Sequence, residues 1–145
     1  MELTTAMLAD AAQVSGGKLY VLGGQWDRLM VGGFPAMHPT MAVVLVIRVE
    51  YTEAPETFQL EAELTLDGQS QDVRAAGQLA TGHSPGQVAG APTFVPLVIA
   101  FAGVVFRGPG RYEWVITADD AELGRVPLEV LAGPVPGGAP GPQAV

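Results

Sequence analysis

The chain has 145 residues, within the range of about 100 to 200 residues that is typical of one domain. Of these residues 48% are hydrophobic and only 15% are charged, which excludes disorder over the whole chain. Asp and Glu number 15 against 7 Lys and Arg, so the net charge is -8 and nucleic acid is not an expected partner. The absence of cysteine excludes disulfides and thiolate metal sites, and it fits the reducing cytoplasm, where we expect the protein to reside.

Neither a targeting segment nor a membrane span is predicted. In the opening MELTTAMLADAA, Glu2 stands where a signal peptide needs positive charge, and Asp10 interrupts the apolar core that such a peptide requires. The uncharged apolar run Thr93 to Phe106 contains Pro96 and is shorter than the roughly 18 to 20 residues of a membrane-spanning helix.

The N-terminal third predicts short elements. Residues 3–8 indicate an edge strand, residues 9–14 a turn or one helical turn, and residues 18–22 a second strand closed by Gly23-Gly24. The run MAVVLVIRVEYT then predicts a central strand that is covered on both faces at first. One of its faces holds Val43, Leu45, Ile47, Val49 and Tyr51, and the other holds Ala42, Val44, Val46, Arg48 and Glu50.

The clearest half-buried strand is FQLEAELTL, in which apolar and polar residues alternate. Asp67-Gly68 is a favoured type I′ hairpin dipeptide, so residues 71–81 should return antiparallel to this strand. Residues 82–92 read as a loop. The following TFVPLVIAFAGVVF, interrupted by Pro96 and Gly103, predicts either two strands or one bent strand.

The C-terminal part predicts a hairpin with its turn at Asp119-Asp120 and its last strand ending near Val130. Tyr112 resembles a tyrosine corner, in which a tyrosine at a strand start bonds to the backbone upstream and fixes a Greek-key crossing. We expect one domain over residues 1–131. The Pro- and Gly-rich residues 132–145 carry no charge, and we expect them to be a flexible tail that folding does not need.

Seven or eight short strands without a long amphipathic helix predict an all-β fold, an antiparallel two-sheet β-sandwich. A small closed β-barrel is the alternative. The inward sets of the strongest alternating runs predict the members of one core: Val43, Leu45, Ile47, Leu60, Leu64, Leu66, Trp114 and Ile116.

The segment LADAAQVSGGKLYVLGGQWDRL, followed by a Pro-containing link and MAVVLVIRV, resembles an uncharacterised family of small bacterial β-rich proteins. The resemblance rests on Leu8-Ala9-Asp10, Gly17-Lys18-Leu19 and Val21-Leu22-Gly23-Gly24, and Tyr112 and the closing strand fit more loosely. It implies an immunoglobulin-like sandwich with a Greek key. The family has no established activity, so the resemblance implies no catalytic residue.

No motif for catalysis, metal or cofactor binding stands out. His38 and His83 fall in predicted loops, far apart in sequence, and neither has a partner at the spacing of a metal site. No serine lies in a nucleophile elbow. The glycine pairs, Gly23-Gly24 among them, lack phosphate-loop spacing and read as β-turns. We therefore expect neither an enzyme nor a cofactor.

Two clusters are candidates for an interaction surface. Trp26 and Arg28 are residue types that dominate interface hot spots, and Asp27 lies between them; the alternative is that Trp26 plugs one end of the sandwich while Asp27 and Arg28 form a local ion pair. Phe34 and Met37 belong to the second cluster, a Pro-containing segment that is either a rim contact or a lid on the core.

The composition favours a non-catalytic interaction or structural module that binds a protein partner or a second copy of itself. Val44 and Val46 support this, because they occupy a sheet face that normally meets water and therefore need a cover. Another subunit is the simplest cover, and the alternative is cover by the chain itself, through its N-terminal segment or through Thr93 to Phe106. The alternative function is a small-molecule-binding domain with its pocket near Trp26.

Overall fold

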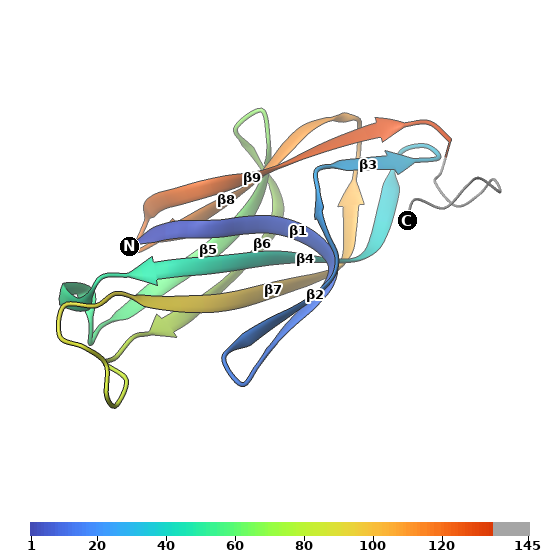
Figure 1. Ribbon diagram of the computed structural model, residues 1–145. Coiled ribbons are helices and arrows are strands. Elements are labelled where there is room, and N and C mark those ends of the chain that lie inside the picture. Colours follow the sequence, from blue (N-terminus) through green and yellow to red (C-terminus); the bar gives the residue numbers. More distant parts are fainter. Residues whose placement is uncertain (135–145) are drawn as a thin grey trace.

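The computed structural model describes residues 1–134, which form nine β-strands in two packed sheets (Figure 1). Sheet A has the strand order β2-β1-β4-β7 and sheet B the order β3-β9-β8-β5-β6. The predicted β-sandwich is confirmed, and neither sheet closes into a barrel within these residues. The strands are β1 (Glu2–Ser15), β2 (Lys18–Trp26), β3 (Arg28–Val31), β4 (Ala36–Val49), β5 (Thr57–Leu66), β6 (Gln69–Ala80), β7 (Thr93–Phe106), β8 (Gly110–Ala118) and β9 (Ala121–Ala132).

Neighbouring strands run antiparallel, with one exception that the sequence did not predict. β3 pairs in parallel with β9, over Arg28–Val31 and Glu129–Ala132. β2 belongs to sheet A and β3 to sheet B, so the chain crosses between the sheets at Asp27. A single short η1 turn (Tyr51–Glu53) lies between β4 and β5, and no helix among the described residues has the length and apolar character to cross a membrane.

Two of the hairpin turns follow directly from their sequences. Asp67 and Gly68 join β5 to β6 with φ values of 50° and 80°, and Asp119 and Asp120 join β8 to β9 with φ values of 48° and 66°. A two-residue type I′ turn needs positive φ at both positions, which Asp and Gly tolerate better than most residues. Both turns lie where they were predicted.

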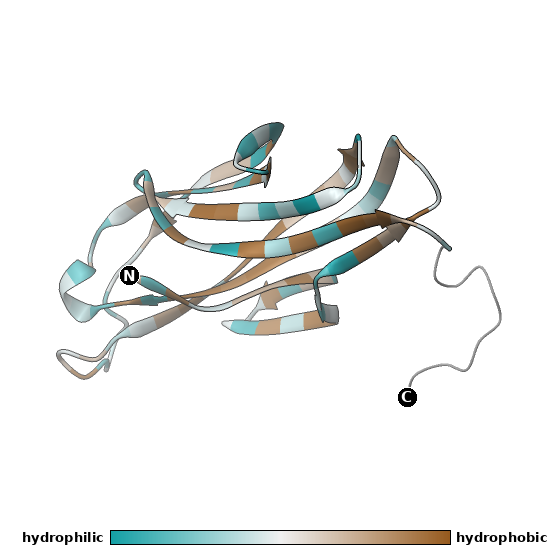
Figure 2. Ribbon diagram, turned by 90° about the horizontal axis from the view of Figure 1, so that it is seen from above, coloured by the Kyte–Doolittle hydropathy of each residue, from teal (hydrophilic) through white to brown (hydrophobic). Residues whose placement is uncertain are grey.

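The core lies between the two sheets and contains the predicted residues. Val43, Leu45 and Ile47 of β4 have no exposed surface, and Trp114 of β8 stacks on Phe101 of β7 with ring centroids 4.2 Å apart. Leu60, Leu64 and Ile116 are also buried, whereas Leu66 is half-buried at the core margin. Hydrophobic and hydrophilic residues alternate along the strands in Figure 2, as expected where one face of a sheet packs on the core.

The N-terminal prediction was wrong in two respects. β1 is one long strand whose predicted turn, residues 9–14, is extended and pairs with β2. β1 is also an inner strand of sheet A and not an edge. Cross-strand pairing outweighs the helix propensity of the alanine-rich ADAAQV, because propensities are small compared with tertiary contacts.

The end of the β1–β2 hairpin leaves sheet A and folds over its outer face. β1 pairs with β4 only from Glu2 to Ala9, and beyond Ala9 it pairs with β2 alone. In Figure 1 this hairpin turns away from the direction of the first half of β1. Gly23-Gly24, predicted to be a turn, lies inside β2 at the bend: Gly23 has φ +58°, and a Cβ there would collide with the Asp10 carboxylate. Glycine adopts this left-handed backbone conformation without strain and leaves room for the Asp10 side chain.

β4 and β7 bend together at the end of the sandwich where β3 lies. The predicted strand begins at Met41, whereas β4 begins five residues earlier, at Ala36. His38 is therefore in a strand and not in a loop. β7 is one bent strand. Before Gly103 the odd-numbered residues Leu97, Ile99 and Phe101 face the core, and after it the even-numbered Val104 and Phe106 do. The alternation therefore shifts by one residue at Gly103, where φ is +65°.

The hydroxyl group of Tyr112 donates a hydrogen bond of 2.7 Å to the carbonyl of Gly108, as the predicted tyrosine corner requires. Tyr112 is buried, and its ring meets the ring of Phe106 edge-on at 5.0 Å. Tyr112→Phe should therefore lower the free energy of unfolding by about 0.5 to 1.5 kcal/mol while the fold is kept. Urea unfolding measures this loss, and an unchanged midpoint would contradict a role for the bond.

The predicted tail lies mostly outside the described residues. Ala132 belongs to β9, and the N–H of Gly133 donates to the carbonyl of Val31 at 2.9 Å. The last strand therefore ends one residue after residue 131, where the predicted domain ends. Residues 135–145 are outside the described part of the chain, so the prediction of a dispensable tail stays a prediction.

Candidate functional site

The Trp26 cluster lies where the chain crosses from sheet A to sheet B. Trp26 is half-buried, packs against the core and meets the ring of His38 edge-on at 6.0 Å. Its indole N–H is buried without a hydrogen-bond partner. The hollow beside Trp26 has a volume of only about 160 Å³, whereas pockets for drug-sized ligands have roughly 300 to 1,000 Å³.

The expected local ion pair between Asp27 and Arg28 is absent. Arg28 instead pairs with Glu129 of the adjacent strand β9, with an Nη2–Oε1 distance of 3.3 Å. The carbonyl of Asp27 accepts a hydrogen bond of 2.8 Å from the N–H of Glu129. The parallel pairing of β3 with β9, which local sequence does not reveal, brings Glu129 to this place.

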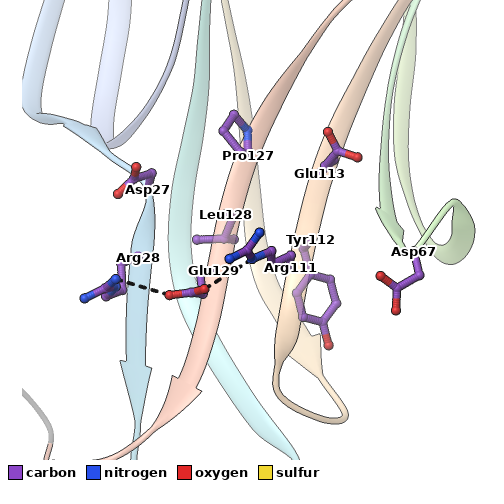
Figure 3. Close-up of a pocket in the computed structure, with 9 residues that line it drawn as sticks. All are labelled: Asp27, Arg28, Asp67, Arg111, Tyr112, Glu113, Pro127, Leu128 and Glu129. Carbon is purple, nitrogen blue, oxygen red and sulfur yellow. Dashed lines mark ion pairs between the residues drawn. The ribbon is translucent and has the colours of Figure 1, made fainter.

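A charged depression of about 570 Å³ opens on the outer side of sheet B (Figure 3). Arg28 and Arg111 approach Glu129 from opposite sides in this view, with Arg111 Nε 3.5 Å from Glu129 Oε2. The side chain of Arg111 is 87% exposed. Exposed ion pairs of this kind contribute about 0 to 1 kcal/mol to the free energy of unfolding. They make the surface of sheet B polar and do not by themselves define a binding site.

A second ion network lies on the same sheet. The guanidinium of Arg125 donates to the Glu122 carboxylate at 2.8 and 3.0 Å and to Glu113 at 3.2 Å. These bonds favour the charged carboxylate and hold the pKa of Glu122 below its ordinary value. The stabilisation is therefore present at neutral pH and is lost as the pH falls through this lowered pKa.

Arg125→Gln should raise the pKa of Glu122, because the hydrogen bonds from the guanidinium are the main cause of its depression. An NMR titration of the side-chain carboxyl groups measures this change. Glu53 is the internal control: hydrogen bonds from the N-terminal amine and from the Glu50 N–H lower its pKa, and neither involves Arg125. A pKa of Glu122 that does not move would contradict the assigned cause.

The two histidines are separated and have aromatic neighbours. His38 is in β4 beside Trp26, and His83 lies in the loop between β6 and β7, where its ring stacks on Tyr51 at 3.8 Å. The Nε2 atom of His83 is 3.0 Å from the carbonyl of Tyr51. Within residues 1–134 no group of three His, Asp or Glu side chains is placed to hold a metal ion.

The second predicted cluster is divided by the structure. Phe34 is half-buried and packs against the core, which fits the lid interpretation. Met37, in contrast, is 62% exposed on β4, directly opposite the exposed Val105 of β7. Val105 was not among the predicted site residues. Its exposure follows from the shift of faces at Gly103, which a regular alternation does not reveal.

The chain itself covers Val44. Val44 has no exposed surface and lies in a small cluster with Ala9 and Ala42, against which Leu19 and Val21 of the hairpin pack. The N-terminal segment is therefore the cover, with a contribution from Val98 of β7. Val46 lies farther along the face and is half-buried. Of the two valines, Val44 is not available to a partner in this arrangement.

The two sheets differ strongly in the character of their surfaces. Six exposed large hydrophobic side chains lie on sheet A: Val14, Tyr20, Leu22, Met37, Phe94 and Val105. No such side chain lies on the described strands of sheet B. The charges show the opposite distribution. Sheet A strands carry Glu2, Asp10, Lys18 and Arg48, whereas sheet B strands carry Arg28, Glu61, Glu63, Asp72, Arg74, Arg111, Glu113, Glu122, Arg125 and Glu129.

Sheet A carries the exposed large apolar residues and sheet B carries most of the charged residues, which favours different surroundings for the two sheets. Tyr20, Leu22 and Phe94 were not among the predicted site residues. A signal was present in the sequence for Phe94 alone, because Thr93 to Phe106 contains no charge. Sheet A is the candidate functional surface.

Comparison with known proteins gives a family match. The family of unknown function DUF6941 matches residues 4–131. No curated protein and no solved structure matches the chain.

Proposed function

The chain belongs to the family of unknown function DUF6941. We propose that it is a non-catalytic protein-interaction module that associates with itself. The observation that supports this proposal is the apolar surface of sheet A. Leu22 is 72% exposed and Met37 62%, and exposed large apolar side chains that occur on the strands of one sheet and not on those of the other favour a protein contact on the first sheet.

Self-association is tested by light scattering over a range of protein concentrations. We expect a mass of at least twice that of one chain, falling on dilution. Two copies with different tags, expressed together, should also be captured by either tag. A monodisperse monomer at the highest soluble concentration, with no capture between the tagged copies, would contradict the proposal.

A small-molecule-binding domain is the second candidate, and one observation favours it. The 570 Å³ depression includes Asp27 and Arg28, next to Trp26 in the sequence. Its lining is charged and open to solvent, whereas ligand pockets are mostly apolar and enclosed. Native mass spectrometry of the purified protein tests this candidate. A bound small molecule that is lost in Arg28→Gln would support it, and a mass equal to that of the chain alone would count against it.

Two finer assignments belong to this proposal. An immunoglobulin-like arrangement is supported by the hydrogen bond from Tyr112 to Gly108, which is the bond of a tyrosine corner. A cytoplasmic location is supported by the absence of cysteine.

A further inference from the structure

The two sheets have four edge strands, β2 and β7 in sheet A and β3 and β6 in sheet B. These strands differ in how well they are protected against pairing with another chain. β3 has only four residues, and β6 carries Asp72 and Arg74 together with an irregular register against β5. β2 carries Lys18 and is irregular near Gln25, where φ is +66°. Short length, charges and bulges are the usual devices that keep an edge from pairing.

β7 is the remaining edge strand, and it lacks most of these devices. Its 14 residues carry no charge, and its register with β4 is continuous from Thr93 to Ala102. Long, regular and apolar edges are the ones that accept a further strand. Phe94, on this strand, is 56% exposed.

Pro96 limits where a further strand can pair. In an antiparallel ladder, consecutive residues direct their N–H and C=O alternately to the two sides. Pro96 pairs with Val46 of β4 and has no N–H, so its backbone belongs to the set that points to the free edge. By the same alternation, Val98, Ala100 and Ala102 also point there. The segment available for pairing is therefore Val98 to Ala102, between Pro96 and the bend at Gly103.

This segment is suited to pairing with a second copy of itself. β7 carries no charged side chain, so a second copy that pairs along it brings no like charges into the ladder itself, although each chain has a net charge of -8. Asp10 of the β1–β2 hairpin lines a hollow on the outer face together with Ala100 and Ala102. An antiparallel pair centred on Ala100 places Ala100 of one copy opposite Ala100 of the other. Val98 then lies opposite Ala102 on the outer face of the ladder.

The same register extends the core across the contact. Ile99 and Phe101 point inward but are only half-buried in the single chain. In the paired arrangement Ile99 of one copy is the neighbour of Phe101 of the other, an aliphatic–aromatic cross-strand pair. Pairing therefore buries apolar surface that the isolated sandwich leaves open at its β7 edge.

We propose that β7 is the self-association site, where two copies join their A sheets by antiparallel pairing of Val98 to Ala102 about a twofold axis near Ala100. This assignment rests on the proposed function, since it names the partner and the strand through which sheet A acts.

A lysine at the axis tests the assignment. Ala100 is exposed in the single chain, so Ala100→Lys should keep the fold but bring two like charges together in the dimer. Ala76→Lys is the matched control, an exposed alanine on the other long edge strand, β6. Light scattering should show the mass halved for Ala100→Lys and unchanged for Ala76→Lys, with circular dichroism confirming that both variants fold.

A single cysteine gives a second, independent test, because the natural chain has no cysteine to compete. Opposed residues of a hydrogen-bonded antiparallel pair have Cα atoms about 5.5 Å apart, a separation that a disulfide spans. Under oxidised glutathione, Ala100→Cys should become a disulfide-linked dimer at least tenfold faster than Ala76→Cys. This result also decides the question if Ala100→Lys does not fold.

The outcomes separate the two proposals. A wild-type dimer that persists in Ala100→Lys, together with equal cross-linking of the two cysteine variants, would overturn the β7 site while self-association stands. A wild-type monomer at high concentration would overturn both.

Discussion

Val44→Lys is expected to destabilise the folded chain strongly without releasing a partner. Val44 is fully buried under Leu19 and Val21 of its own hairpin, so a lysine there places an unpaired charge in an apolar cluster. An uncompensated buried charge costs about 3 to 5 kcal/mol, a large part of the about 5 to 15 kcal/mol that stabilises a typical domain. Urea unfolding followed by circular dichroism measures the loss.

Thr40→Lys is the matched control for this experiment. Thr40 lies on β4 and on the same face, but its side chain is exposed to solvent. Its substitution should change the free energy of unfolding by less than about 0.5 kcal/mol. A folded Val44→Lys variant of unchanged stability and lower mass would instead mean that another subunit covers this face.

Ile47→Ala is expected to cost about 2 to 5 kcal/mol of unfolding free energy, because it removes a branched side chain from the interior and leaves a cavity. Ile47 has no exposed surface and packs with Val49 and Leu60 between the sheets. The neighbouring Val46→Ala provides the comparison, since Val46 is half-buried on the opposite face and its loss should be smaller. Equal losses at the two positions would contradict the assignment of faces in β4.

The strands that sequence reasoning located well are those with strict alternation between apolar and polar residues. In β5, Leu60, Ala62 and Leu64 face the core as predicted, because the charged Glu61 and Glu63 that alternate with them take the opposite face. The turns at Asp67 and Asp119 were predictable for a different reason, since positive φ favours few residue types.

The elements that were missed depend on contacts distant in the sequence. Alternation in residues 9–14 is weak because each face of that segment mixes alanine with a polar residue, Gln13 on one face and Asp10 on the other. Its pairing with β2 makes it a strand. The partner of β3 is β9, about a hundred residues later, and no local pattern indicates a parallel pair between them. The ion pair from Arg28 to Glu129 follows from that pairing and was therefore not predictable.

The candidate surface was predictable only in part. The absence of charge from Thr93 to Phe106 is visible in the sequence, but the same composition fits an inner strand that is buried on both faces. Whether β7 is inner or at an edge depends on the strand order of sheet A. The strand order therefore decides whether this apolar run is buried inside sheet A or lies at its edge.

Hydrogen–deuterium exchange of the wild-type protein, followed by peptide in concentrated and in dilute solution, tests most directly whether sheet A is the surface through which the chain associates. We predict that peptides from β7 exchange more slowly in concentrated solution, because their outward N–H groups are paired there, while peptides from the charged edge β6 exchange alike in both. Protection that does not depend on concentration, or that appears on β6 and not on β7, would contradict the account.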